Sequence, residues 1–507
     1  MKAECAVEVR FQKMKRGRRH RGEPLRYLKI DGCDRREERM LTQAIANHFS
    51  RRDGEGISDK KSAPAIWRDE KLGLLRSAHA EILLRFHRGT SDAQKQKVLD
   101  LFDLESAPNS LHAHEERLVV RCKNRKQVGL ALPSLATSLE ELHEVRSAAP
   151  NYISQVKRSI AAHAMPSFSS LRQWHLAQID AKKAWMFSAG AGVKIAVLDD
   201  GVDVDHGDLR LAMAYRPDAS EERDQFGRDF STASHLDEHF NPRPKSFHAP
   251  FEKLDFNDNH GTPCAGLIAS RGLVVFSAQP TVGVAPRSLI LPVRIFSGGG
   301  MVSDARLSDA IAYAGRLVDV ISMSFVYGAS SEIRSVLEDV AHHGRNGKGC
   351  VAIAATGNEK FDDFVPWPAA YDDVIGVSAC THQGVRASYA NVGPGTDCCA
   401  PSSSDIDGRV HGIVTCDVSI AGRGFNIGKA NQGGVDGKHT STFGGTSAAA
   451  PQVAGIAALV LAAHPDFSAQ QVKQALLQGA TFLGEELGAG RVNAMGALMA
   501  ARQISES

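Results

Sequence analysis

The hydrophobic residues of this chain follow two patterns, which alternate from Val193 onwards. Short runs of consecutive apolar residues predict strands buried on both faces, and the segments between them, with apolar residues every three or four positions, predict helices. Such an alternation is typical of an α/β domain with a mostly parallel sheet flanked by helices. The predicted strands are VKIAVLDDG, LILPVRIF, DVISMSF, CVAIAATGN and DVIGVSA, and the helices include SDARLSDAIAYAG and SSEIRSVLEDVAHHG.

A smaller unit precedes this domain. AEILLRFHRG, ERLVVRC and HEVRSAAPNYI predict strands, whereas SDAQKQKVLDLF and LPSLATSLEEL predict helices. This order is compatible with a ferredoxin-like βαββαβ sandwich. MPSFSSLRQWHL has little periodicity and predicts a linker. We therefore expect an N-terminal segment over residues 1–77, a small α+β unit over residues 78–160 and the α/β domain over residues 161–507.

The N-terminal segment contains the dense basic run RFQKMKRGRRHR, followed by REERMLTQAIANHF, which predicts a short amphipathic helix. Two interpretations of the basic run are open. Such blocks are usually solvated arms. The alternative is a contact to nucleic acid or to an acidic protein partner.

The composition is that of an ordinary globular protein and points to no particular partner. Of 507 residues, 43% are hydrophobic and 23% are charged, and the formal net charge is +2. No apolar run is long and uninterrupted enough to predict a membrane span. No apolar stretch follows the basic N-terminus and the nine cysteines are scattered, so we expect a cytoplasmic protein, or a secreted one if the start codon was misassigned.

Four polar residues stand at predicted strand ends or helix starts: Asp199, His260, Asn358 and Ser447. Each alone has an ordinary structural interpretation, as a turn-former, a packed histidine, a turn asparagine or a helix cap. Together they lie where a parallel sheet builds its sites. A hydroxyl nucleophile needs a base, the base needs an orienting carboxylate, and a developing oxyanion needs hydrogen-bond donors. The four residues supply these groups.

VLDDGVDVDHGDL, HGTPCAG, AATGN and GGTSAAAPQVAG resemble the signature segments of the subtilase family of serine proteases, in its Asp, His, Ser order. The match covers roughly Trp174 to Ala501. The forms DDG and HGTxCAG resemble its kexin-like branch, although we expect no kexin-type P domain in the few residues after Ala501.

The resemblance implies a serine endopeptidase acting on proteins or peptides. Ser447 is then the nucleophile, His260 the general base and acid, Asp199 the orienting carboxylate and Asn358 the oxyanion donor. The alternatives are a non-catalytic binding protein that keeps the subtilase fold, and a protease recruited by a nucleic-acid-binding basic arm. All four positions carry the expected residue types, which favours the enzyme.

The small unit also carries a resemblance. EILLRFHRGTSDAQKQKVL and VRSAAPNYI resemble the inhibitory propeptides of secreted subtilases. This resemblance implies a zymogen whose own propeptide is a partner of the catalytic domain. We expect self-cleavage between Tyr152 and Arg172.

Substrate contacts are also implied by the resemblance. We expect DVISMSF to be an edge strand that pairs with an extended substrate. The acidic residues of GNEKFDD form either a solvated loop or a negative rim that prefers a basic P1 residue; Lys157–Arg158, inside the expected junction, fits the second interpretation. The expected channel residues are Ser324, Phe325 and Val326 on one wall, Ala355, Thr356 and Gly357 on the other, and Glu359, Asp362 and Asp363 at the rim.

Metals are not required for the implied chemistry. Asp208 aligns with a calcium ligand of the family, but the loop that would complete that site, RGLVVFSAQPT, is poor in oxygen side chains, so a structural calcium ion stays an open expectation. Cys264 lies four residues after His260, on the same helix face. Cys264 is either a packing residue or a source of sensitivity to thiol-binding metals.

Overall fold

The protein is described from a computed structural model. The structure describes residues 65–158, 173–214, 227–231, 258–419 and 438–506, with short gaps at 70, 79, 108–116, 124–130, 277–278, 298–299 and 407–408, and also residues 4–6, 9–11, 28–30, 243–244 and 424–425. The predicted helix REERMLTQAIANHF and nearly all of the basic run lie outside these residues. The end of the predicted linker is helical, because Trp174–Gln178 forms α5.

A seven-stranded parallel sheet forms the centre of the larger domain, in the order β13-β16-β12-β18-β20-β21-β22. All five predicted strands are confirmed, and the short β13 and β22 were not predicted. DVISMSF is not an edge strand, because β18 lies between β12 and β20. The strands are β12 (Lys194–Asp199), β13 (Arg228–Asp229), β16 (Leu289–Arg294), β18 (Val320–Met323), β20 (Val351–Ala355), β21 (Val374–Cys380) and β22 (Cys398–Pro401).

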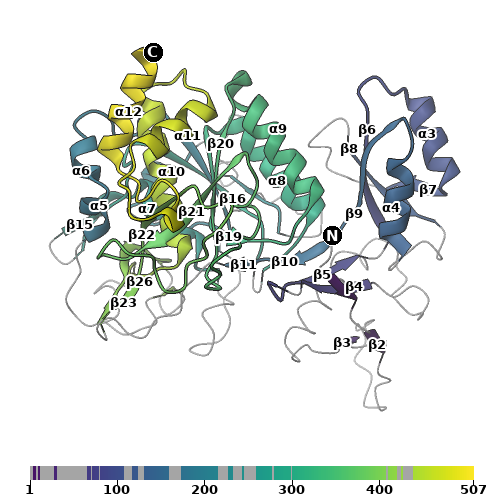
Figure 1. The fold of residues 1–507 in the computed structure, drawn as a ribbon, viewed down its shortest axis with the longest axis horizontal. Helices are drawn as coiled ribbons and strands as arrows, with labels where there is room; N and C mark the ends of the chain where they lie inside the picture. Colours follow the sequence, from purple (N-terminus) through teal and green to yellow (C-terminus); the bar gives the residue numbers. More distant parts are fainter. Residues whose placement is uncertain are drawn as a thin grey trace.

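Helices cover both faces of this sheet (Figure 1). Successive side chains of a strand point to opposite faces. Accordingly, Ile195 and Val197 pack in one core with α7 (Gly261–Ala269) and α10 (Thr446–Ala463), whereas Leu198 packs in a second core with the helices of the other face. Those helices are α8 (Asp304–Leu317) and α9 (Ser331–Gly347). Helix α10 is long and apolar enough to cross a membrane, but it is buried as the core helix of this domain.

Additional elements complete the larger domain. Helices α6, α11 and α12 pack with α10 on its side of the sheet. The predicted loop RGLVVFSAQPT forms the hairpin β14–β15. The bounds are α6 (Ala181–Ala184), α11 (Ala469–Gln478), α12 (Ala494–Glu506), β14 (Arg271–Phe276), β15 (Gln279–Val282), β23 (Ser404–Ile406), β24 (Arg409–His411), β25 (Ile413–Cys416), β26 (His439–Phe443) and two short 3-10 helices, Arg210–Ala212 and Glu485–Leu487.

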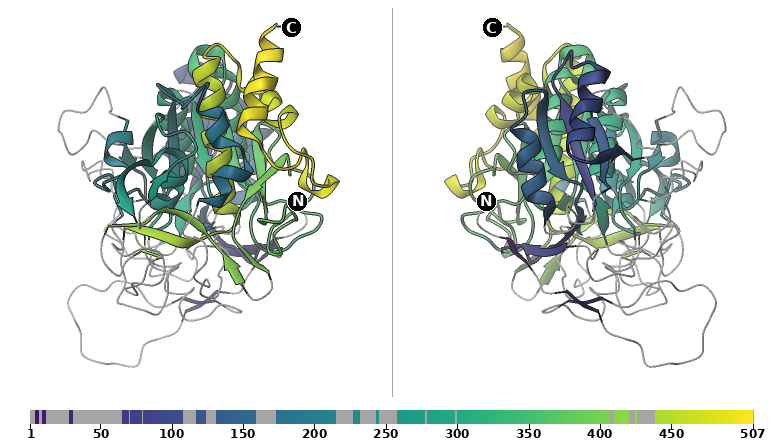
Figure 2. Two further views of the ribbon diagram at one scale, coloured as in Figure 1. Left: turned by 90° about the vertical axis from the view of Figure 1, so that its left-hand side faces the viewer. Right: turned by 90° about the vertical axis from the view of Figure 1, so that its right-hand side faces the viewer.

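The small α+β unit has the predicted element order, with one short strand, β7, that the sequence pattern did not predict. Its antiparallel sheet has the order β7-β8-β6-β9, and it has a hydrophobic core of its own. The unit lies beside α8 and α9, with its helices on the far side of its sheet (Figures 1 and 2). The elements are β6 (Glu81–Phe86), α3 (Asp92–Leu101), β7 (Leu104–Ser106), β8 (Arg117–Cys122), α4 (Leu132–Glu140) and β9 (Val145–Pro150).

The chain that leaves the small unit runs along the larger domain as two short strands. Strand β10 (Ile153–Gln155) pairs antiparallel with β17 (Met301–Ser303), and β11 (Lys157–Arg158) pairs antiparallel with β19 (Phe325–Val326). Strand β10 also belongs to the five-stranded sheet β1-β4-β5-β10-β17. The predicted boundary at residue 77 therefore falls inside a strand of this shared sheet. The remaining strands are β1 (Glu4–Ala6), β2 (Val9–Phe11), β3 (Leu28–Ile30), β4 (Ala65–Asp69) and β5 (Leu75–Ala78).

Candidate active site

An aspartate and a histidine form the buried centre of the site. Asp199 is the last residue of β12, and His260 immediately precedes α7. His260 Nδ1 lies 2.9 Å from Asp199 Oδ2 and 3.0 Å from Oδ1. A carboxylate that holds Nδ1–H leaves Nε2 as the basic nitrogen. His260 Nε2 is buried and has no hydrogen-bond partner among the described residues.

Ser447 lies in the first turn of α10, but it is not the helix cap. The N-cap is Gly445, whose φ of 79° is in the region that favours glycine, so the cap interpretation of Ser447 is wrong. Ser447 Oγ donates to the carbonyl oxygen of Ser324 at 3.0 Å, and Ser324 Oγ donates to the carbonyl oxygen of Ser447 at 3.1 Å. To pair with His260 Nε2, the Ser447 hydroxyl has to exchange its present acceptor.

The side-chain amide of Asn358 is fixed on one side and unpaired on the other. Its Oδ1 accepts hydrogen bonds from Thr446 N at 3.0 Å and from Thr446 Oγ1 at 3.1 Å. Its Nδ2 is buried without a hydrogen-bond partner in the described part of the chain. Buried unsatisfied polar groups are rare and call for an explanation. A preorganised donor for a negative oxygen explains this one.

A second aspartate, Asp200, binds the backbone of His260 and of the residue after it. It is fully buried and accepts hydrogen bonds from the backbone amides of His260, at 3.0 Å, and Gly261, at 2.8 Å. These amides open α7, where the helix dipole favours a negative charge. Burial raises the pKa of Asp200 to about 7, while the Arg158 guanidinium, at 3.1 Å, opposes that rise.

A buried arginine ties the segment before His260 to the sheet. Arg294 of β16 contacts Asp258 at 2.8 Å and Asp229 at 2.7 Å, and its Nε donates to the carbonyl oxygen of Asp200 at 3.1 Å. Sequence reasoning missed this network, and it also missed Thr446. Thr446 directly precedes Ser447, and Asp258 lies two residues before His260. Closeness in sequence to a predicted site residue was therefore the one signal that could have pointed to them.

The two predicted walls of the channel face each other at Gly357. A Cβ at this position would lie 3.0 Å from Val326 Cγ1 and 2.7 Å from Glu359 Oε2, and φ is +95°, so the position requires glycine. Thr356 Oγ1 donates to the carbonyl oxygen of Asn391, while Asn391 Nδ2 donates to the carbonyl oxygen of Thr356 at 2.8 Å and to Glu359 Oε2 at 2.7 Å. Sequence reasoning missed Asn391, because no motif around it marks it as part of the site.

The three acidic residues of GNEKFDD do not form one rim. Glu359 Oε1 lies 2.7 Å from Lys157 Nζ of β11. Asp362 instead pairs with Arg386 at 2.7 Å, and Asp363 pairs with Lys71 at 3.7 Å. Of the three predicted rim residues, Glu359 is the one that contacts β11.

Strand β11 brings two basic side chains to the predicted channel residues of β19. Lys157 pairs with Val326, and Arg158 pairs with Phe325. Arg158 reaches Asp200, next to Asp199, and its Nη1 donates to Asn259 Oδ1 at 3.3 Å. Strand β11 therefore adds a cation to the buried carboxylates of the site.

The surroundings of Asp208 do not fit a calcium ion. Its buried carboxylate lies 2.8 Å from His439 Nε2, and its backbone amide donates to His206 Nδ1 at 3.1 Å. Calcium takes six to eight oxygen ligands, and imidazole nitrogens do not supply them.

Cys264 lies between the catalytic elements. Its Sγ is 4.0 Å from His260 Nδ1 and 3.8 Å from the carbonyl oxygen of Ser447. Burial raises the pKa of this thiol well above its usual value, so the side chain is a neutral packing group.

Comparison with known proteins gives consistent relatives. Residues 190–496 match the sequence profile of the Subtilase family (Peptidase_S8). The chain is 31% identical over 376 residues to a calcium-dependent protease of a Nostoc species, covering 68% of this chain and 50% of that protein. It is 28% identical over 316 residues to subtilisin E of Bacillus subtilis, covering 61% of this chain and 66% of the relative. The chain thus spans about half the length of the Nostoc relative.

A solved structure shares the fold. The structure of fervidolysin from Fervidobacterium pennivorans, described as a keratinolytic enzyme related to subtilisin, matches with a TM-score of 0.60 and 21% identity. The match covers 83% of this chain and 61% of that one. The larger domain therefore has the subtilisin-like α/β fold predicted from the sequence.

The raised pKa of Asp200 predicts a pH-dependent stability. Between the ordinary carboxyl pKa of 3.8 and about 7, the folded state keeps a proton that the unfolded state has lost, so the free energy of unfolding falls as pH rises. Asp200→Asn removes this contribution. Urea unfolding from pH 4 to 8, in a Ser447→Ala background, should show the variant gaining stability relative to its parent as pH rises to about 7.

Asp92→Asn is the matched control for this comparison, because it makes the same substitution at an exposed carboxylate. An equal pH dependence of the two variants would contradict the assignment to Asp200.

Proposed function

Because this chain belongs to the subtilase family, we propose that it is a serine endopeptidase whose catalytic groups are Asp199, His260, Ser447 and Asn358. The observation that carries the proposal is a pair of buried polar atoms without hydrogen-bond partners among the described residues, His260 Nε2 and Asn358 Nδ2. Asn358 Oδ1 is bonded to Thr446, next to Ser447. The Cys264 sulfur lies 4.0 Å from His260 Nδ1 and 3.8 Å from the carbonyl oxygen of Ser447. An unsatisfied buried polar group costs about 1–3 kcal/mol. A non-catalytic binding protein would lose stability through these two unpaired atoms without any benefit to catalysis, which disfavours that alternative.

The chemistry follows from these positions. Ser447 Oγ attacks the substrate carbonyl carbon as its proton passes to His260 Nε2, and Asp199 stabilises the resulting imidazolium. The negative oxygen of the tetrahedral intermediate accepts hydrogen bonds from Asn358 Nδ2 and from the backbone amide of Ser447. His260 then protonates the leaving amine. Water, activated by the same histidine, hydrolyses the acyl-enzyme.

The small unit is proposed to be an inhibitory propeptide. Its support is the pairing of strand β11 with β19 and a buried ion cluster between the two units. Glu332 of α9 binds Arg85 at 2.9 and 3.1 Å, Arg117 at 3.0 Å and Ser308 Oγ at 2.6 Å. Burial alone would raise the pKa of Glu332, but Arg117 and Arg85 outweigh it and hold the pKa at about 2. Glu332 therefore stays charged and keeps the two arginines paired.

A preference for basic substrate residues is part of the proposal. Glu359 contacts Lys157 and Asp200 contacts Arg158, so acidic side chains hold two successive basic residues of β11. Asp200 is the second aspartate of DDG, which supports the kexin-like resemblance. Residue 159 and those after it lie outside the described residues, so we propose Glu359 and Asp200 as the carboxylates that select basic residues and assign neither of them to P1.

We propose calcium binding from the names of two relatives alone. Two relatives, 31% and 32% identical, are named calcium-dependent proteases. Since the contacts of Asp208 do not fit calcium, any such ion would have to bind elsewhere in the chain.

Self-processing is the first test. Purified wild type should split between Tyr152 and Arg172 while Ser447→Ala stays whole, as gels and N-terminal sequencing of the fragments would show. If both stay whole and a fluorophosphonate probe fails to label Ser447 after limited proteolysis has removed the small unit, the protein is not a serine peptidase. If the probe labels an uncut chain, the catalytic proposal stands and self-cleavage is wrong.

Asn358→Ala tests the oxyanion site. Losing one preorganised donor should lower kcat about 10²–10³-fold with little change in KM, because the bond forms only in the transition state. Steady-state kinetics on a peptide substrate measure this. Thr446→Ser, which keeps the hydroxyl that orients Asn358, is the control; equal losses in both variants would argue against a specific donor role.

Glu359→Gln tests the basic preference. A half-exposed ion pair contributes up to about 1 kcal/mol, so the ratio of kcat/KM for Arg over Leu substrates should fall roughly 3–5-fold. Paired substrates differing at P1 and at P3 locate the affected position. Asp362→Asn removes a neighbouring carboxylate that pairs with Arg386 and should leave the ratio unchanged. A wild-type enzyme that prefers Leu over Arg would contradict the proposed preference for basic residues.

A further inference from the structure

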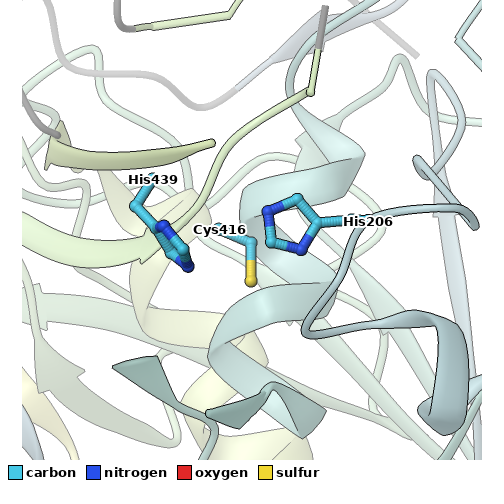
Figure 3. Close-up of side chains that lie close together, drawn as sticks. All are labelled: His206, Cys416 and His439. Atoms are coloured by element: carbon cyan, nitrogen blue, oxygen red, sulfur yellow. The ribbon is translucent and has the colours of Figure 1, made fainter. Parts of the chain in front are cut away.

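A second cluster of reactive side chains lies buried outside the catalytic centre. It consists of His206, Cys416 and His439, whose relative exposures are 0%. His206 follows β12, Cys416 ends β25 and His439 opens β26. Figure 3 shows the two imidazole rings on either side of the Cys416 thiol. One ligand atom from each residue lies within 4.8 Å of the others.

Oxygen atoms orient both imidazoles. His206 Nε2 lies 2.8 Å from the carbonyl oxygen of Lys438, and His439 Nε2 lies 2.8 Å from Asp208 Oδ2. A metal-binding histidine almost always donates its other ring N–H to a carboxylate or a backbone carbonyl. These two contacts are of that kind. His206 Nδ1 accepts the Asp208 amide at 3.1 Å, a bond that coordination through Nδ1 would replace.

We propose that His206, Cys416 and His439 bind one divalent transition-metal ion of the Zn²⁺ class. Two imidazoles and a thiolate suit zinc or cobalt, whereas calcium prefers oxygen ligands. On binding, the Cys416 thiol loses its proton to solvent and its sulfur forms the bond to the metal, with no change in oxidation state. Asp208 is a positioning residue that acts through His439.

The distances allow such an ion after a small contraction. Ligand atoms around a tetrahedral zinc lie about 2.0–2.3 Å from the metal, and hence roughly 3.3–3.8 Å from one another. The separations of up to 4.8 Å here would have to shrink by about 1 Å. Rotation of two imidazoles and one thiol about their side-chain bonds provides movement of that size.

The site would connect segments that carry the catalytic groups. His206 lies in the loop after the strand that ends at Asp199, and His439 opens the strand before the helix that carries Ser447. Strand β25 packs directly on α7, since a Cβ at Gly266 would lie 2.8 Å from Cys416 Cβ. A bound ion would therefore stabilise the region around the active site without touching substrate.

The test uses the full chain with Ser447→Ala, stripped of metal and titrated with Co²⁺. We expect one equivalent to bind, to give a thiolate-to-cobalt absorption band and to raise the melting temperature. Cys416→Ser should abolish the band and the thermal shift. Asp208→Asn should weaken binding about 10–100-fold, as loss of a carboxylate behind a ligating histidine does. Excess Ca²⁺ should not displace the cobalt.

Two cysteine variants serve as controls. Cys350→Ser removes a buried thiol of the other core and should leave binding unchanged. Cys264→Ser examines the second group that could hold an ion, Asp199, His260 and Cys264. A band lost in Cys264→Ser but kept in Cys416→Ser would place the ion at the catalytic pair and overturn the proposal.

Three further outcomes would also overturn the proposal: no band in the parent, no thermal shift in the parent, or displacement of cobalt by Ca²⁺. If Cys416→Ser fails to fold, as judged by circular dichroism, His206→Gln replaces it in the comparison and should lower the affinity at least tenfold. Unchanged affinity in that variant would overturn the proposal as well.

Discussion

The structure depends on placing three aspartates out of water at one edge of the parallel sheet. Asp199, Asp200 and Asp258 are all at most 1% exposed. The folded state is stable only if each buried carboxyl group has a positive or polar partner. Asp199 has the His260 ring, Asp258 has Arg294, and Asp200 has the first amides of α7 together with Arg158. The start of α7 therefore has two roles. Its first backbone amides stabilise the Asp200 carboxylate, and it positions His260.

Sequence patterns predicted the elements better than the contacts among them. The five buried strands and the order of the small unit were correct, because burial on both faces and helical spacing leave a direct trace in the residues. Strands of two to four residues, such as β13 and β22, leave too short a trace. The position of β18 inside the sheet depends on long-range pairing that local composition does not encode.

The same limit applies to the site. The four residues Asp199, His260, Asn358 and Ser447 stand in recognisable segments, and the structure pairs Asp199 with His260 and bonds Asn358 to Thr446, the neighbour of Ser447. Thr446, Asn391 and Arg294 act through hydrogen bonds to partners that lie far away in the sequence, so their types alone carried no signal. The cap interpretation of Ser447 was wrong because the N-cap of α10 is Gly445, two residues before Ser447. His206 and Cys416 are separated by 210 positions, so no spacing pattern could join them.

The shared sheet bears on the timing of the activation proposed above. Strand β10 contributes backbone hydrogen bonds to β5 and to β17, and Arg76 of β5 reaches Ser154 and Asp304. If the proposed self-cleavage breaks a peptide bond beyond Arg158, all of these interactions, and the cluster around Glu332, would stay in place. The product would be a noncovalent complex in which β11 still pairs with β19. Activity would then appear at the rate at which that strand dissociates from its partner, so latency would depend on dissociation kinetics rather than on the covalent state of the chain.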